Sequence, residues 1–194
     1  MKSVVLPIAP LMVCAALSAQ GVFSNKTQAI LEKVIQDYPH RFIDIKGEQV
    51  AQTHEATEYR STVQLPGSSG IITRTNTPAR DPAREEVTWS CSFFEPAGFE
   101  RAKSRYREVF DQIRNSIITG SDQKTFILTT GQYQDPASDK KYSHVFFSLL
   151  PGVGAEKRLH VELSLHEEAR GWKITLSVYD HEPAGDAQIA STQK

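Results

Sequence analysis

Residues 158–180 read RLHVELSLHEEARGWKITLSVYD and carry the clearest periodic pattern of the chain. Two runs, 158–166 and 172–180, alternate between apolar and polar side chains on either side of a short polar stretch. A period of two is typical of strands with one buried and one solvent-facing side. We therefore predict a hairpin that turns at 167–171. Its buried side carries the apolar positions Leu159, Val161, Leu163, Leu165, Trp172, Ile174, Leu176 and Val178.

Upstream of this hairpin, shorter segments show the same alternation or short apolar runs bounded by turn residues. A Gly-Ser-Ser-Gly turn at 67–70 separates the first two of these strands. The third points Val87, Trp89, Cys91 and Phe93 to one side, which predicts a buried face there. The predicted strands are 57–65, 71–75, 86–94, 125–132 and 142–150.

Two helices are predicted from apolar residues at steps of three and four. The first covers 25–38 and is ended by Pro39. The second starts near Pro96 and continues to Gly120, with apolar positions from Phe99 to Ile117. The segment 42–47 has no pattern that assigns it to a helix or a strand.

These elements predict an α+β fold in the order α-β3-α-β4, with two helices packed on the apolar face of one or more antiparallel sheets. The two halves share a similar pattern, which leaves open whether the chain contains a duplicated α-β-β-β unit. We expect a single domain at 20–181. The residues from 182 to 194 are rich in Ala, Gly, Ser and Gln and are expected to form a flexible tail.

The N-terminus has the three parts of a secretory signal peptide. Lys2 is followed by an apolar stretch up to Leu17 and by the small residues Ser18 and Ala19. The apolar stretch is too short to span a membrane. We therefore predict that residues 1–19 are cleaved and that the protein is exported, to a periplasm or to the extracellular space. Cys14 suggests lipid attachment as a rival, but the bulky Val13 before it disfavours that reading.

The charge balance of the chain argues against nucleic acid as a partner. The sequence has 22 Lys and Arg against 23 Asp and Glu, with a formal net charge of -1. Binding to phosphates requires a concentrated basic surface. The one basic series is typical of a solvated, salt-bridged helix face, because it lies on a predicted helix that also carries acidic residues. Its members are Arg101, Lys103, Arg105 and Arg107, and the acidic residues are Glu100, Glu108 and Asp111. The same balance disfavours anionic membranes.

The sequence contains no strong catalytic or metal-binding motif. Gly67-Ser68-Ser69-Gly70 lacks the spacing of a nucleophile elbow, and Cys91 shares its predicted inward side with Trp89. No two histidines have the close spacing of His-x-x-x-His. We therefore predict no cofactor and no metal ion.

The polar side of the C-terminal hairpin is the best candidate for a binding surface. Alternate positions on one strand lie nearly 7 Å apart, so His160 and Glu162 can converge on one ligand. The hairpin places residues of its second strand beside them. The predicted binding residues are His160, Glu162, His166, Tyr179 and His181.

The strand at 142–150 is apolar on both sides, unlike the others. One side carries Tyr142, His144, Phe146 and Leu150, and the other carries Val145, Phe147 and Leu149. Such a strand is either covered on both faces or lines an apolar groove.

Together these patterns predict a small exported domain that binds a protein or a small-molecule ligand through its sheet, without enzymatic activity. An exported hydrolase or metal-dependent enzyme that uses the His160, Glu162 and His166 side is the first alternative. A carrier of an apolar molecule, based on the strand at 142–150, is the second.

Overall fold

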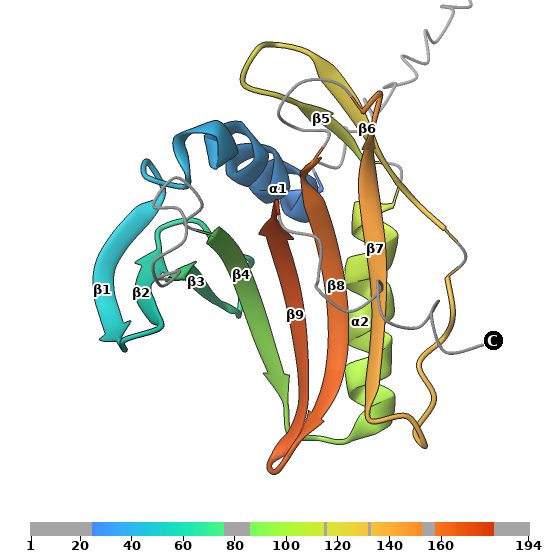
Figure 1. Cartoon of the computed structure of the whole chain (residues 1–194). Helices are drawn as coiled ribbons and strands as arrows, with labels where there is room; N and C mark the ends of the chain where they lie inside the picture. Colours follow the sequence, from blue (N-terminus) through green and yellow to red (C-terminus); the bar gives the residue numbers. More distant parts are fainter. Residues whose placement is uncertain (1–24, 76–85, 115, 132, 153–157, 181–194) are drawn as a thin grey trace, which may run out of the picture.

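The computed structural model describes residues 25–75, 86–114, 116–131, 133–152 and 158–180 (Figure 1). The predicted signal peptide at 1–19 and the predicted tail at 182–194 lie outside these residues. Neither helix of the described part is long and apolar enough to cross a membrane. The elements in chain order are α1 (Lys26–Asp37), η1 (Tyr38–His40), β1 (Lys46–Gln52), β2 (Ala56–Ser61), β3 (Ser69–Thr75), β4 (Glu86–Glu95), α2 (Phe99–Ile113), β5 (Ile117–Thr119), β6 (Thr125–Thr130), β7 (Tyr142–Leu150), β8 (His160–Glu168) and β9 (Gly171–Tyr179).

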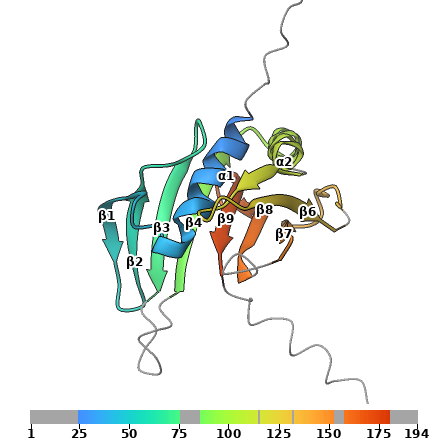
Figure 2. The same ribbon diagram turned by 90° about the horizontal axis from the view of Figure 1, so that it is seen from above.

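The described strands form one antiparallel sheet of nine strands in the order β1-β2-β3-β4-β9-β8-β7-β6-β5. Seen from above, this order runs from β1 at the left to β7 and β6 at the right (Figure 2). The sheet consists of two meanders that meet where β4 pairs with β9, from Trp89 opposite Val178 to Glu95 opposite Trp172. The α+β class and the antiparallel pairing are therefore confirmed.

The predicted order α-β3-α-β4 is wrong, because four strands precede α2 and five follow it. The two additional strands are β1 and β5, which lie at the two ends of the sheet. β5 falls inside the segment that was predicted as the end of the second helix. That helix ends at Ile113, because Arg114 has an extended backbone with ψ of 133°. The described elements therefore do not form two repeats of one helix and three strands.

The C-terminal hairpin is confirmed in pairing and in orientation. β8 and β9 pair along their whole length, from His160 opposite Tyr179 to Glu168 opposite Gly171. Gly171 is required at the turn, since its φ is 146° and a Cβ there would lie 2.7 Å from the carbonyl oxygen of Glu95. All eight apolar positions of the two predicted strands are buried.

One hydrophobic core fills the side of the sheet on which α2 lies, here called the inner face. Figure 1 shows α2 behind β7 and β8. Tyr106 on α2 donates a hydrogen bond from its hydroxyl to the carbonyl oxygen of Leu163 on β8. The inward residues of β4 are also buried, with Trp89 and Cys91 fully enclosed. The opposite side of the sheet is called the outer face.

The packing of α1 differs from the expectation that both helices lie on the sheet. α2 contacts β8 and β9, whereas the main neighbours of α1 are β5 and α2. β5 follows α2 and returns beside α1, so the first helix lies against an edge strand instead of the central strands. Leu31, Val34 and Ile35 on α1 are still fully buried in the common core.

Side chains of α1 cover the free edge of β5. Gln28 donates to the carbonyl oxygen of Ile117, and Gln36 donates to that of Thr119. Glu32 accepts a hydrogen bond from the backbone N–H of Thr119. These three residues are spaced four apart and therefore share one side of the helix. The helix thus satisfies three backbone groups of β5 that point away from β6.

The other end of the sheet, β1, is treated differently. β1 pairs only with β2, and its register shifts twice, once on each side of Gln49. Five of its seven residues are exposed. Irregular, short and polar edge strands resist pairing with other chains.

Candidate functional site

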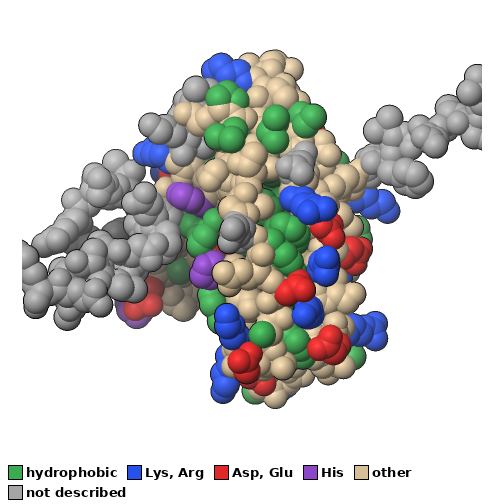
Figure 3. Space-filling model, turned by 90° about the vertical axis from the view of Figure 1, so that its right-hand side faces the viewer, with side chains coloured by type: hydrophobic (Ala, Val, Ile, Leu, Met, Phe, Trp, Pro, Cys, Tyr) green, Lys and Arg blue, Asp and Glu red, His purple; other side chains and the backbone are tan. Residues whose placement is uncertain are grey.

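β7 has two chemically different faces. On the inner face Phe147 is fully buried and lies against Phe110 of α2, with ring centroids 5.7 Å apart. On the outer face Tyr142, His144 and Phe146 are exposed and form a continuous row, with successive ring centroids 5.1 and 4.8 Å apart. Figure 3 shows the side of the molecule that carries β7 and α2, where hydrophobic and histidine side chains lie exposed among polar ones. The inner face of β7 is therefore core, and its outer face is a surface.

Only half of β7 is paired on the side of β6. The pairing runs from Ile127 opposite Leu150 to Thr130 opposite Phe147, where β6 ends. On its other side β7 pairs with β8 down to Tyr142. Among the strands that the structure describes, the segment from Tyr142 to Phe146 therefore has a neighbour on one side only.

The register shows which backbone groups face this open side. The N–H of Glu167 donates to the carbonyl oxygen of Lys141, and hydrogen-bonded positions alternate along an antiparallel pair. The N–H and C=O groups of Tyr142, His144 and Phe146 consequently point away from β8. Within the described ranges, neither a strand nor the segment 133–141 hydrogen-bonds to them. We call this stretch the open edge of β7.

A hollow of about 380 Å³ lies at the open edge. It is formed because the chain leaves β6 and turns toward α2. There Tyr133 packs on Phe110 with ring centroids 4.2 Å apart, and Asp135 lies 3.8 Å from both Lys103 and Arg107. The hollow is lined by Thr130, Gly131, Gln134, His144, Val145 and Phe146.

Glu162 links the row on β7 to β9. Phe146 is its direct partner across the strands. The hydroxyl of Tyr142 donates to Oε1 of Glu162, and the hydroxyl of Tyr179 donates to Oε2, both at 2.8 Å. Partial burial raises the pKa of both phenols, and the neighbouring carboxylate raises it further. Both tyrosines are therefore hydrogen-bond donors at neutral pH, and each oxygen of Glu162 already has a partner.

The predicted binding residues are only partly brought together. His160 lies beside Tyr179, with ring centroids 5.8 Å apart, and so belongs to the group around Glu162. His166 is four residues along the strand from Glu162, about 13 Å away. It contacts Glu168 at 3.1 Å instead, and this contact and Lys173 lower the pKa of Glu168. His181 lies outside the described residues.

Two residues of this surface were missed by the sequence prediction. Tyr142 and His144 were assigned to a strand face, but their place beside Glu162 depends on the pairing of β7 with β8. The 2.8 Å contact between Tyr142 and Glu162 joins residues twenty positions apart. Alternation within a strand predicts which side chains share a face, but it does not predict which strands become neighbours in the sheet.

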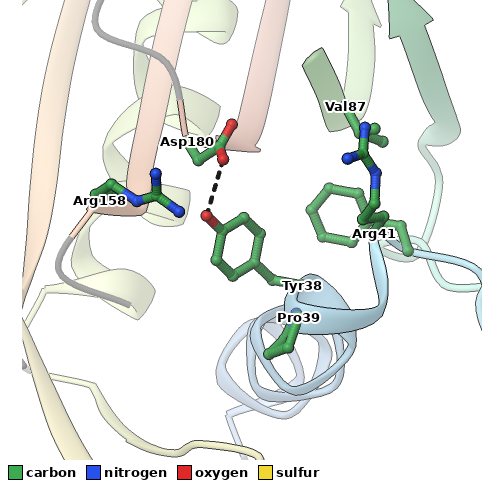
Figure 4. A pocket seen from close by; sticks show the side chains of 7 residues that line it. Tyr38, Pro39, Arg41, Val87, Arg158 and Asp180 are labelled. Carbon is green, nitrogen blue, oxygen red and sulfur yellow. Dashed lines mark hydrogen bonds between the residues drawn. The ribbon is translucent and has the colours of Figure 1, made fainter. Parts of the chain in front are cut away.

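A second hollow, of about 300 Å³, lies where η1 meets the ends of β8 and β9. In Figure 4 the side chain of Tyr38 points to Asp180, with Arg158 beyond and Arg41 beside Val87. The hydroxyl of Tyr38 donates to Oδ2 of Asp180 at 3.0 Å. This contact ties η1 to the end of β9.

The cysteine and the one cluster of metal-ligand side chains in the described residues both lie away from the surface around Glu162. Cys91 is fully buried, accepts a hydrogen bond from the N–H of Leu65, and has its pKa raised by burial. The prediction of a core thiol is therefore confirmed. In the described part of the chain, one group of three potential metal ligands lies close together, formed by Asp37, His40 and Asp44 at the end of α1. The surface around Glu162 contains no such group among the described residues.

In comparisons with known proteins, no protein-family model, no curated protein and no solved structure matches the chain.

Proposed function

We propose that this protein is an exported, non-enzymatic binding module that takes up an extended segment of a partner protein along the open edge of β7. The observation that carries the proposal is the half-paired β7, whose backbone groups at Tyr142, His144 and Phe146 have no strand partner on their open side among the described residues. An extended peptide that pairs with such an edge gains main-chain hydrogen bonds and becomes a further strand of the sheet.

The side chains around the open edge supply the means of selection. In strand addition, alternate side chains of the bound segment face the two sides of the sheet. On the outer face they would meet the row of Tyr142, His144 and Phe146, where aromatic and β-branched cross-strand neighbours are favourable. The hollow beside His144 and Gln134 offers room at the same place. This arrangement favours a partner segment with apolar or aromatic residues at alternate positions.

Glu162 supports this surface by joining three strands. Each of its carboxylate oxygens accepts a hydrogen bond from a tyrosine hydroxyl, one from Tyr142 and one from Tyr179. The two tyrosines and Glu162 form a cross-strand network from β7 to β9 that orders the outer face beside the open edge.

Export belongs to the proposal because of the pattern at residues 1–19. Lys2, the apolar stretch and the small residues at its end are typical of a cleaved signal. Protein purified from the native source or from the medium of a secreting host should begin at or next to Gln20. Exported material that retains Met1 would contradict this part of the proposal.

The binding function is tested with peptides selected on the purified protein from a displayed library of random ten-residue sequences. We expect selected peptides to slow amide hydrogen exchange at Tyr142, His144 and Phe146. The key variant is His144→Pro, which removes an N–H that points away from β8 and so leaves the β7–β8 ladder intact. It should abolish peptide binding, measured by fluorescence anisotropy.

His144→Ala is the matched control, because it removes the imidazole and keeps the N–H. It should weaken binding only partly. Peptides that bind His144→Pro as tightly as the wild type, or a library that gives no specific binder, would rule out strand addition at β7.

A further inference from the structure

The turn between α1 and β1 brings three ligand-type side chains to one point. Asp37 is the last residue of α1, His40 ends η1, and Asp44 precedes β1. Nδ1 of His40 lies 3.0 Å from Oδ2 of Asp44 and 3.5 Å from Oδ1 of Asp37. The three ligand atoms all lie within 4.8 Å of one another.

Asp37 carries a buried carboxylate oxygen that has no hydrogen-bond partner. Its side chain is 6% exposed. Its Oδ2 accepts hydrogen bonds from the N–H groups of Asp44 and Ile45 at 3.1 and 3.2 Å, which fixes the orientation of the carboxylate. Its Oδ1 is buried, has no hydrogen-bond partner and faces His40. A buried carboxylate oxygen without a partner is costly unless a cation or a donor completes it.

We propose that Oδ1 of Asp37, Nδ1 of His40 and Oδ2 of Asp44 bind one divalent transition-metal ion, with zinc as the favoured ion. Bonds of about 2.1 Å to a tetrahedral ion place its ligands about 3.4 Å apart. The distances of 3.0 and 3.5 Å from His40 to the two carboxylates are close to that spacing.

The ligand types decide between classes of metal ion. Calcium and magnesium take oxygen ligands, often with six or more of them, whereas an imidazole with two carboxylates suits zinc and related ions. The side chains of His40 and Asp44 are 63% and 69% exposed. Solvent can therefore reach the ion and supply a water as the fourth ligand.

The ion would lock a turn whose backbone is otherwise unfavourable. Arg41 and Phe42 both have left-handed backbone angles, with φ of 58° and 57°. L side chains seldom adopt that conformation. His40 and Asp44 lie on either side of this pair, so an ion that bridges them ties the end of α1 to the start of β1. The site is separate from the open edge of β7 and does not depend on the proposed peptide binding.

The test uses the full, tag-free chain after treatment with a chelator. Zinc alone should bind with a stoichiometry of one by calorimetry and should raise the melting temperature, because a ligand of the native state stabilises it by mass action. Cobalt in place of zinc should give the visible absorption of a four-coordinate site. His40→Gln should weaken zinc binding at least about tenfold, since even groups that only orient a metal ligand are worth that much.

Asp37→Asn is the second variant, because an asparagine oxygen can still accept the two backbone hydrogen bonds while the charge is removed. It should fold and should also lose zinc binding. The matched control is His160→Gln with His166→Gln, which removes two histidines on the outer face and should leave zinc binding unchanged.

Two outcomes would overturn the site. The first is a wild-type protein that shows no saturable zinc binding. The second is zinc binding that survives His40→Gln and disappears in the His160 and His166 control, which would place the ion on the outer face.

Discussion

The free edge of β5 and the open edge of β7 lie on the same half of the sheet and are treated in opposite ways. At β5, Gln28, Glu32 and Gln36 of α1 each form a hydrogen bond with a backbone group that points outward. At β7, no described residue does so, and the exposed side chains next to the edge are aromatic. The outward side of β5 is thus covered by another part of the fold, whereas the open edge of β7 is not covered by any described residue.

This comparison separates a protected edge from an available one. Natural proteins blunt their edges with bulges, charges or covering elements, because an unpaired strand invites association. β1 follows this rule through its register shifts, and β5 follows it through α1. The open edge of β7 follows neither, which is why we assign binding to it.

The largest effect should come from the inner face of β7, which holds the open edge in place. Phe147→Ala should lower the free energy of unfolding by about 3–5 kcal/mol, because it leaves a cavity against Phe110. Phe146→Ala, at the adjacent outward position, should cost less than about 1 kcal/mol. Urea denaturation measures both. If both variants lowered the free energy of unfolding by a similar amount, the difference between the buried inner face and the exposed outer face of β7 would be contradicted.

The next effect should come from opening the protected edge. Gln28→Ala, Glu32→Ala and Gln36→Ala combined should lower the free energy of unfolding by about 1–3 kcal/mol, because each removes a hydrogen bond worth roughly 1 kcal/mol. Amide exchange at Thr119 should also become faster. Lys26→Ala with Lys33→Ala, on the solvent side of the same helix, is the control and should leave both measurements nearly unchanged. If the triple variant were as stable as this control, the α1 side chains would not protect the edge of β5, and the contrast with the open edge of β7 would not hold.

A smaller, pH-dependent effect is expected from Glu162. Because the pKa of Tyr142 and Tyr179 is raised in the folded state, the stability that their protonated hydroxyls contribute is complete below about pH 10. It is lost as the pH rises through the folded pKa. Glu162→Gln removes the carboxylate that raises the pKa, so phenolate should form at lower pH and the alkaline loss should be shallower. Ultraviolet titration and melting curves check this, and an unchanged titration would contradict the network.

The smallest effect is expected at the two outer histidines. His160→Gln and His166→Gln should each change the free energy of unfolding by less than about 0.5 kcal/mol, as substitutions on a surface usually do. Thermal melts with the chelator present measure this. A loss of several kcal/mol would mean that these side chains hold the sheet together.

The sequence predicted the C-terminal strands well because they bury one side. β7 was predicted with its observed limits, and both strands of the hairpin were predicted to within two residues. The missed elements are the two ends of the sheet. β1 buries no residue fully, so it has no alternation to detect. β5 has three residues, and Ile117 continues the four-residue step from Ile113, so helical spacing hid the strand.

The position of the predicted binding residues followed from the sequence only where a hairpin fixes it. His160, Glu162 and Tyr179 lie together as the hairpin predicted, and their role in binding stays a prediction. The open edge depends on where β6 stops beside β7, which no local pattern records. The cluster of Asp37, His40 and Asp44 was also not predicted. Its members come from the end of a helix, a 3-10 turn and a loop, and no regular periodicity places these side chains together.

The pairing of β4 with β9 has a consequence for how the chain folds. Trp89 must find Val178, almost half of the chain away, before the two meanders become one sheet. Contacts between such distant residues slow folding, and the N-terminal meander must meanwhile keep the backbone edge of β4 unpaired and its apolar face incompletely covered. A chain that is made from its N-terminus therefore cannot close this sheet until β9, the last of the described strands, is available. β9 is thus both the last described strand to be made and the one that joins the two meanders.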